Sequence, residues 1–214
     1  MCMRTSAASH VQVSTAKQHK DLIFDYGGFP PASYSYKYQP PGDETVARRV
    51  VELLSASNVP VKTDSRRGLD HGAFVPLMLM FPEADVPVVT VSLRSGQDAG
   101  MHLQMGLALA PLRHENVLIV GSGLSFHNMG AFFSRGAARQ QGYAHGRAFD
   151  GWLRSTLTNP DCSPEKRMAL LRDWQQAPSA AECQPQGAAE HLMPLFVCAG
   201  VGEGKPVSRV EGLT

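Results

Sequence analysis

Short apolar runs and amphipathic segments alternate along the first half of this chain. Four runs predict strands: Val11–Thr15, Val59–Thr63, Pro87–Leu93 and Val117–Gly121. The last two runs are rich in β-branched residues, which predicts buried, mostly parallel strands. Apolar residues recur at helical spacing in three segments, Glu44–Ser57, Ala73–Phe81 and Gly100–Leu112. This alternation predicts an α/β fold, a layered α-β-α domain around a mostly parallel central sheet.

A long loop and a helical second half complete the pattern. The segment Asp21–Asp43 is rich in glycine, proline and tyrosine, a composition that prevents long regular elements and is typical of a functional surface loop. Beyond Gly123 the pattern predicts helices at Ala148–Leu157, Ser163–Gln176 and Gly187–Ala199. The 214 residues fit one domain, because domains usually hold roughly 100 to 200 residues.

The charge balance and the cysteines exclude several classes of function. Lys plus Arg number 20 against 19 Asp plus Glu, so the formal charge of +1 offers no basic field for nucleic acid or anionic lipid. No apolar run reaches the roughly 18 to 20 residues of a membrane span, and no secretory signal is recognisable, so we expect a cytoplasmic protein. The cysteines form no C-x-x-C pair, and we expect them to be reduced thiols.

Histidine is the residue type that points most directly to chemistry, since imidazole binds transition metals and transfers protons near neutral pH. One of the eight histidines, His71, follows Asp70 directly ahead of the apolar segment Ala73–Phe81. A histidine at such a loop-to-helix junction is typical of an active site. Alternatively, Asp70 caps the helix and His71 only packs against its surroundings.

His127 lies just past the carboxyl end of the predicted strand Val117–Gly121, behind a Gly-Ser-Gly turn. Ligands of open α/β sheets bind at the carboxyl ends of strands, and glycines there allow close approach of the backbone. The alternative is a histidine that donates to a nearby carbonyl. A phosphate-binding loop is not indicated, because the G-x-G-x-x-G spacing and a Walker lysine are missing, and the G-x-S-x-G turn of serine hydrolases is missing too.

His191 follows Glu190 near the front of an otherwise apolar segment, where a polar pair can face a cleft. A satisfied core histidine is the alternative. His102 shares its helix face with methionines, so we expect a structural role. The four histidines in polar or loop contexts are expected to be solvated: His10, His19, His114 and His145. Cys198 lies in an apolar run and is expected to be a small core side chain rather than a nucleophile.

Five segments in order resemble the family of class III extradiol ring-cleaving dioxygenases, and within it the 4,5-DOPA extradiol dioxygenase branch. The resemblance covers about Val11 to Ala199. The segments are Phe24–Pro30 (FDYGGFP), Gly68–Leu77 (GLDHGAFVPL), Pro87–Leu93 (PVVTVSL), Gly121–Asn128 (GSGLSFHN) and Glu190–Leu195 (EHLMPL).

The resemblance implies an oxidoreductase that opens a catechol-type, DOPA-like ring beside its diol, using O2 and a non-haem divalent metal, Fe(II) or Zn(II). By position, His191 is implied as a metal ligand, with Glu190 as the fallback. The resemblance also implies that His127 is a ligand or an acid/base, and that His71 contacts substrate and moves a proton. It further implies that an aromatic loop walls the ring pocket, through Tyr26, Phe29 and Pro30.

Two parts of the family pattern are not found in this sequence. Family members carry a His-Gly-x-Pro segment and an Ala-His-Trp-Glu segment before the strand that corresponds to Val11–Thr15. In this chain, His10 only superficially echoes the second of these segments. Family members also have a further strand after the last helix. We therefore expect residues 1–214 to form a single dioxygenase-like domain, incomplete at both ends relative to the family. Exposed sheet edges would favour a homo-oligomer. The alternative function is an inactive family member acting as a binding or regulatory protein, and a metal-dependent hydrolase is a third possibility.

Overall fold

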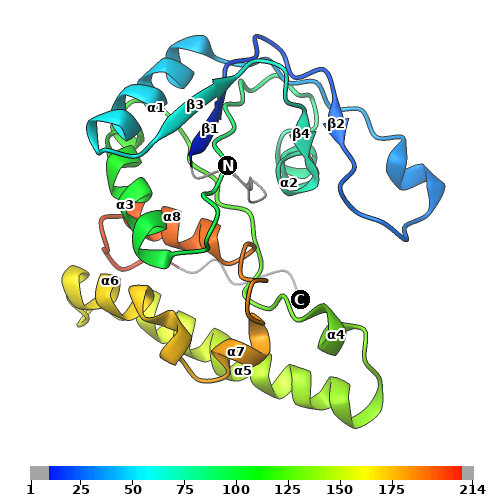
Figure 1. Cartoon of the computed structure of the whole chain (residues 1–214), viewed down its shortest axis with the longest axis vertical. Helices are drawn as coiled ribbons and strands as arrows, with labels where there is room; N and C mark the ends of the chain where they lie inside the picture. Colours follow the sequence, from blue (N-terminus) through cyan, green and yellow to red (C-terminus); the bar gives the residue numbers. More distant parts are fainter. Residues whose placement is uncertain (1–9, 209–214) are drawn as a thin grey trace. The chain divides into compact units, whose positions relative to one another are not determined.

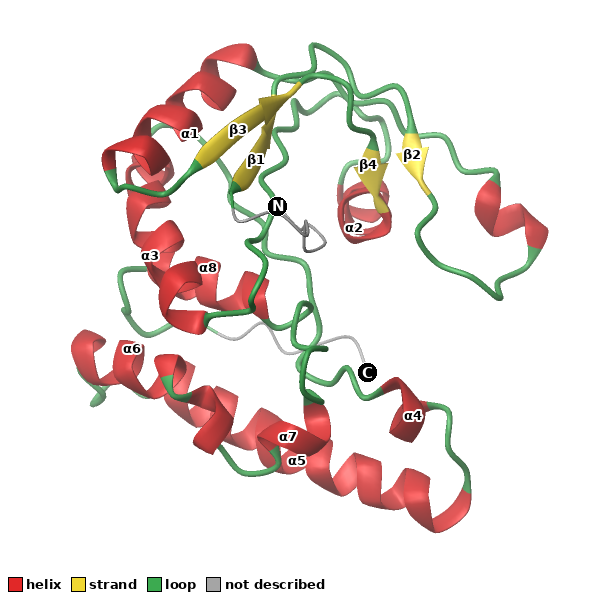
Figure 2. Ribbon diagram, in the orientation of Figure 1, coloured by secondary structure: helices red, strands yellow, loops and turns green. Residues whose placement is uncertain are grey.

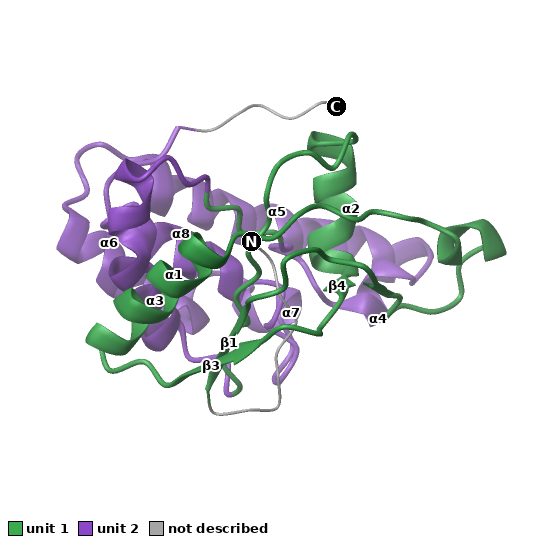
Figure 3. Cartoon of the chain, turned by 90° about the horizontal axis from the view of Figure 1, so that it is seen from above, with its two compact units in different colours: residues 1–95, 119–122 green, residues 96–118, 123–214 purple. Residues whose placement is uncertain are grey.

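The computed structural model describes residues 10–208, which form two compact units (Figure 3). The first unit holds the residues up to Ser95 together with Ile119–Ser122. The second unit holds Gly96–Leu118 and the residues from Gly123 onwards. Strands and helices both occur, and the α/β class predicted from the sequence is confirmed. Among the described residues, no helix combines the length and the apolar character needed to cross a membrane.

The first unit is built on two pairs of short parallel strands (Figure 2). Strand β1 (Val11–Ser14) pairs with β3 (Val61–Asp64), with Val11 opposite Val61. Strand β2 (Leu22–Ile23) pairs with β4 (Leu69–Asp70), with Ile23 opposite Asp70. The second pair places the residues that follow β2 and β4 at the same end of two neighbouring strands.

Two helices cover these strands, as the apolar spacing predicted. Helix α1 (Glu44–Ala56) packs on β1 and β3, and α2 (His71–Met80) packs on β2 and β4. The side chain of Asp43 accepts the N–H groups of Thr45 and Val46, so α1 begins with a capped first turn. The long loop holds only β2 and the short 3-10 helix η1 (Pro31–Tyr34), as its glycine and proline content predicted.

The predictions of regular, parallel strands at Pro87–Leu93 and Val117–Gly121 are wrong. Residues 90–92 run antiparallel to β1, and two serine hydroxyls take backbone N–H bonds that a regular ladder would use: Ser92 Oγ accepts from Gln12, and Ser14 Oγ accepts from Thr90. Residues 117–121 are a loop with Leu118 72% exposed (Figure 2). A β-branched run does not by itself specify a partner strand, and none of the described residues pairs with this one.

The second unit is helical. Helix α3 (Ala99–Leu109) continues into the 3-10 helix η2 (Ala110–His114). The elements that follow are α4 (Met129–Phe132), α5 (Gly136–Thr158), α6 (Pro164–Arg172), the 3-10 helix η3 (Trp174–Gln176), α7 (Ala180–Cys183) and α8 (Met193–Val201). The helix predicted from Gly187 thus begins later, at Met193, because residues 190–192 form a turn.

Helices α3 and α8 lie side by side and anchor that turn (Figure 1). A Cβ atom at Gly106 would lie 2.0 Å from the carbonyl oxygen of Val197, and one at Gly200 would lie 2.2 Å from that of Leu103. Both positions therefore need glycine for the two backbones to approach this closely. The contact fixes α8, and with it the start of the helix just after His191.

Candidate active site

Three potential metal-binding side chains meet in the second unit: His127, Glu190 and His191. One ring nitrogen of each histidine and a carboxylate oxygen of Glu190 all lie within 4.8 Å of one another. The ring centroids of the two histidines are 3.9 Å apart, and Nδ1 of His127 lies 3.6 Å from Oε1 of Glu190. All three side chains are partly buried, so the cluster is neither locked in the core nor spread over the surface.

A close backbone contact joins the Gly-Ser-Gly turn to the turn that carries His191. The N–H of Leu124 donates to the carbonyl oxygen of His191 over 2.9 Å. A Cβ atom at Gly123 would lie 2.0 Å from that same oxygen. Glycine at this position lets the backbones of the two segments touch. The sequence predicted that this turn allows a close approach of the backbone, and in the structure the turn approaches the segment that carries His191.

The segment before α4 is held by the end of α7. The backbone N–H of His127 donates to the carbonyl oxygen of Cys183 over 2.8 Å. The side chain of Asn128 donates to the carbonyl oxygen of Glu182 over 2.8 Å and also accepts from Ala131, which caps α4. The side chain of Gln184 donates to the carbonyl oxygen of Leu124 over 3.0 Å. These bonds fix the backbone on both sides of the His127 ring.

Gln97 holds the loop that presents Glu190. Its Oε1 accepts the N–H of Ala189 over 3.0 Å, and its Nε2 lies 2.9 Å from the carbonyl oxygen of Gly187 and 3.4 Å from Oε2 of Glu190. Gln97 itself has a positive φ of 53°, which is uncommon for a residue with a side chain. Sequence reasoning missed Gln97, because no local pattern links it to a loop so distant along the chain.

The ring of His127 has one nitrogen fixed by the backbone. Its Nδ1 donates to the carbonyl oxygen of Ala188 over 3.2 Å, so the alternative expected from the sequence, a bond to a nearby carbonyl, does occur. With Nδ1 protonated in this bond, Nε2 is the ring nitrogen of His127 that could bind a metal. Histidine ligands almost always donate their other ring N–H to a carbonyl or carboxylate, which orients the ring.

The donor set suits a non-haem divalent metal. Two imidazoles and one carboxylate that leave coordination positions open are the typical ligands of non-haem Fe(II) oxygenases, and Zn(II) accepts the same atoms. The residues that would hold the metal are His127, His191 and Glu190. Among the described residues, no other group of this kind is found.

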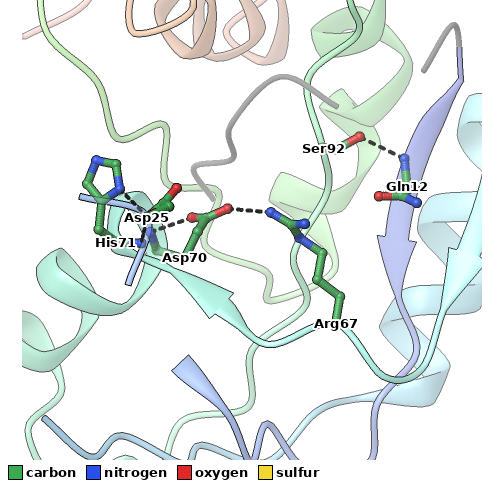
Figure 4. Close-up of polar contacts among 7 residues, drawn as sticks. Gln12, Asp25, Arg67, Asp70, His71 and Ser92 are labelled. Carbon is green, nitrogen blue, oxygen red and sulfur yellow. Dashed lines mark hydrogen bonds and ion pairs between the residues drawn. The ribbon is translucent and has the colours of Figure 1, made fainter. Parts of the chain in front are cut away.

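His71 lies in the first unit, where it is bonded to a buried carboxylate. Its Nδ1 is 2.6 Å from Oδ1 of Asp25, and its backbone N–H donates to the same oxygen over 3.3 Å (Figure 4). The Asp25 side chain is 6% exposed and that of His71 is 33% exposed. Burial raises the pKa of the Asp25 carboxyl, but the hydrogen bonds from the His71 ring and backbone, together with the Coulombic effect of His71, outweigh this and leave that pKa lowered.

Asp70 caps α2, as one of the two alternatives from the sequence predicted. Its Oδ1 accepts the N–H of Ala73 over 3.2 Å, and its Oδ2 forms an ion pair with Arg67 over 3.0 Å (Figure 4). The cap does not reduce His71 to a packing residue, since its ring is bonded to Asp25. Sequence reasoning missed Asp25, which stands inside the quoted segment Phe24–Pro30 without a distinguishing pattern.

The aromatic loop lies against His71. The Tyr26 ring meets the His71 ring edge-on at 5.9 Å between centroids, and Phe29 meets Tyr26 edge-on at 5.3 Å. The Tyr26 hydroxyl donates to the carbonyl oxygen of Ser33 over 2.5 Å, which closes the loop on itself. Phe29 is 59% exposed. Tyr26 therefore presents ring surface rather than its hydroxyl, and Phe29 has apolar surface open to a ligand.

The other histidines divide between core and surface. His102 is fully buried and bonds the carbonyl oxygen of Asp98, which confirms a structural role. The prediction that His19 is solvated is wrong: it is buried, and its Nε2 donates to the carbonyl oxygen of Val88. Its backbone N–H donates to the carbonyl oxygen of Pro40 in the long loop, and contacts between such distant residues leave no local sequence pattern. His145 is partly buried and bonded to Ser179, whereas His114 is exposed.

Comparisons with known proteins find similar sequences. Residues 2–213 match the family model described as the catalytic LigB subunit of aromatic ring-opening dioxygenase. A 4,5-DOPA dioxygenase extradiol of Beta vulgaris is 42% identical over 84% of this chain and 64% of its own length. The dioxygenase tasH of Hapsidospora irregularis is 41% identical over 84% of this chain and 56% of its own length.

Bacterial proteins are similar as well. A 4,5-DOPA dioxygenase extradiol of Escherichia coli is 33% identical over 93% of this chain and 71% of its own length. The crystal structure of an uncharacterized Escherichia coli K12 protein matches with a TM-score of 0.66 and 26% identity, over 90% of this chain and 70% of that one. The chain thus spans less than two thirds of the length of the Beta vulgaris and Hapsidospora proteins.

Proposed function

Because this chain belongs to the family of the catalytic LigB subunit of aromatic ring-opening dioxygenases, we propose that it performs extradiol cleavage of a DOPA-like catechol. The observation that carries the proposal is the cluster of His127, Glu190 and His191, whose donor atoms lie within 4.8 Å of one another. A carboxylate with two imidazoles is what a non-haem Fe(II) site requires.

The proposed reaction inserts both atoms of O2 into the ring beside the diol and gives a semialdehyde acid. A bound Fe(II) or Zn(II) would supply Lewis acidity toward the catechol oxygens, and iron would in addition allow electron exchange with O2. The chain's own contribution is to hold the donors in place. Gln97 orients the Glu190 carboxylate, and the carbonyl oxygen of Ala188 orients the ring of His127.

The substrate-facing roles of the first unit are carried over from the resemblance. We propose that His71 contacts the catechol and accepts one of its protons, which is a task suited to imidazole near neutral pH. Tyr26 and Phe29 supply apolar surface for the aromatic ring. His127 has two proposed roles, as a ligand or as an acid/base.

Anaerobic loading with Fe(II), followed by DOPA and air, tests the activity. We expect a yellow product whose mass exceeds that of DOPA by two oxygen atoms. His191→Ala is expected to abolish this product, whereas Glu182→Gln, on the exposed face of α7, is expected to retain it. Loaded wild-type protein that leaves several catechols unchanged would contradict the proposal and favour a binding role.

The proposal also includes the identity of the metal, the cytoplasmic location, the oligomeric state and the organisation of the catalytic domain. Metal analysis of protein purified from its source would decide between iron and zinc. Cell fractionation tests the cytoplasmic location, and sedimentation tests self-association into a homo-oligomer. We also propose that the two units serve one catalytic domain, so neither unit expressed alone is expected to cleave a catechol.

A further inference from the structure

We infer that Asp25 is the positioning residue for His71: its carboxylate accepts the Nδ1 proton and so makes Nε2 the nitrogen that takes a proton from the substrate. This inference rests on the proposed dioxygenase function for its catalytic part. The other part, that Asp25 sets which nitrogen of His71 carries the proton, depends only on the contact between these two residues of the first unit.

The strand pairing explains why these two residues meet. Strands β2 and β4 are parallel neighbours with Ile23 opposite Asp70. Asp25 follows shortly after β2, and His71 follows β4 directly as the first residue of α2. Side chains just past the carboxyl ends of adjacent parallel strands lie at the same edge, which is where α/β proteins place reactive groups.

Two hydrogen bonds join His71 to the same oxygen of Asp25, and the one from the ring is short. Oδ1 of Asp25 lies 2.6 Å from Nδ1 of the His71 ring and 3.3 Å from the backbone nitrogen of the same residue. A carboxylate oxygen only accepts, so Nδ1 must carry the proton in this bond. With Nδ1 protonated in the neutral ring, the lone pair of the imidazole is on Nε2.

Asp25 keeps the charge that this role requires. The His71 bonds offset the effect of burial, and the pKa of the Asp25 carboxyl stays below its usual value. Asp25 is therefore a carboxylate at neutral pH, where it also stabilises the imidazolium that forms when Nε2 accepts a proton.

The N-terminal cap of α2 helps to hold His71 in position beside Asp25. Asp70 caps the first turn of α2 and is itself held by Arg67 over 3.0 Å (Figure 4). The backbone of His71 therefore has a fixed position, and the ring reaches Asp25 from there. The edge-on Tyr26 ring packs against the imidazole on another side.

Nitrogen NMR of the histidine rings tests the inference without turnover. We expect the neutral ring of His71, assigned by loss of its signals in His71→Gln, to show a protonated Nδ1 and an unprotonated Nε2. In Asp25→Asn, we expect a smaller fraction of the neutral His71 ring to be protonated on Nδ1. A wild-type His71 protonated on Nε2 alone would overturn the inference, even if the variant does not fold.

Kinetics with a catechol test the catalytic part. Asp25→Asn is expected to lower kcat by about 10²-fold or more, within the range of acid–base catalysis, with a smaller change in KM. The double variant with His71→Gln is expected to be no slower than His71→Gln alone, because Asp25 acts through His71. Asp43→Asn, which keeps the cap of α1, is the matched control and is expected to leave kcat unchanged.

The outcomes separate this inference from the proposed function. Wild-type protein without turnover would remove the proposed function, while the tautomer of His71 would still be decided by its spectrum. Multiplicative losses in the double variant would show that Asp25 acts independently of His71 and would overturn the positioning role.

Discussion

The imidazole rings of His127 and His191 lie 3.9 Å apart between centroids, with their planes inclined by 36°. One ring comes from the loop before α4 and the other from the turn before α8. Two imidazoles this close would repel each other if both were protonated, whereas neutral rings can direct lone pairs at one cation. With Glu190 beside them, these side chains could hold a metal ion, as we propose.

Removal of the Glu190 charge should weaken metal binding. Glu190→Gln keeps the size of the side chain but loses the anionic ligand, so we expect the affinity for Fe(II) or Zn(II) to fall by more than the roughly 10- to 100-fold typical of a lost supporting contact. Competition with a chelator measures this. Glu182→Gln is the control, and an equal affinity in both variants would count against Glu190 as a ligand.

Gln97 should act on the metal through Glu190 and its loop. Gln97→Ala removes the bonds to Gly187, Ala189 and Glu190, so we expect a loss of about 10- to 100-fold in metal affinity. Gln104→Ala, at an exposed position of α3, provides the matched control. Unchanged binding in Gln97→Ala would show that the loop holds its shape without this residue.

Gly123 should not tolerate a side chain. A Cβ atom there would lie 2.0 Å from the backbone oxygen of His191, so Gly123→Ala should lower the free energy of unfolding by about 1–3 kcal/mol, as overpacking does. Gly151→Ala is the control, because nothing lies within 4 Å of its Cβ and alanine favours a helix interior. Denaturant unfolding compares the two variants, and similar stabilities would contradict the close contact.

The buried His19 predicts a loss of stability in mild acid. Burial lowers its pKa below 6.5, and the bond to the carbonyl oxygen of Val88 offsets only part of this. As the pH falls below 6.5, the unfolded chain therefore binds a proton that the folded chain does not, so the free energy of unfolding decreases. His19→Gln, whose amide can donate to Val88, should flatten this dependence between pH 7.5 and 5.5 in denaturant titrations. An identical slope in wild type and variant would contradict a neutral, buried His19.

Local patterns were enough to predict part of this molecule. The spacing of apolar residues located α1, and Ser163 marked the start of α6, since its side chain accepts the N–H of Lys166. The class of fold and the family followed from the order of strands, helices and motifs. His127 and His191, which the resemblance implies as site residues, lie together in the structure, although their catalytic roles stay predictions.

The remaining features depend on contacts between distant segments. Gln97 and Asp25 look ordinary in sequence, because each matters only through a partner that folding brings beside it. The loop at Val117–Gly121 shows the same limit, since a β-branched run becomes a strand only when another strand pairs with it. His19 is buried for a similar reason, because its hydrogen-bond partners Pro40 and Val88 are distant from it along the chain.

Anomalous diffraction at the iron edge, from crystals loaded with Fe(II) under anaerobic conditions, tests the central claim most directly. The account predicts one strong peak at ligand distance, about 2.0–2.2 Å, from a ring nitrogen of His127, a ring nitrogen of His191 and a carboxylate oxygen of Glu190. A peak bound to other residues, or no peak in protein that has taken up iron, would contradict it.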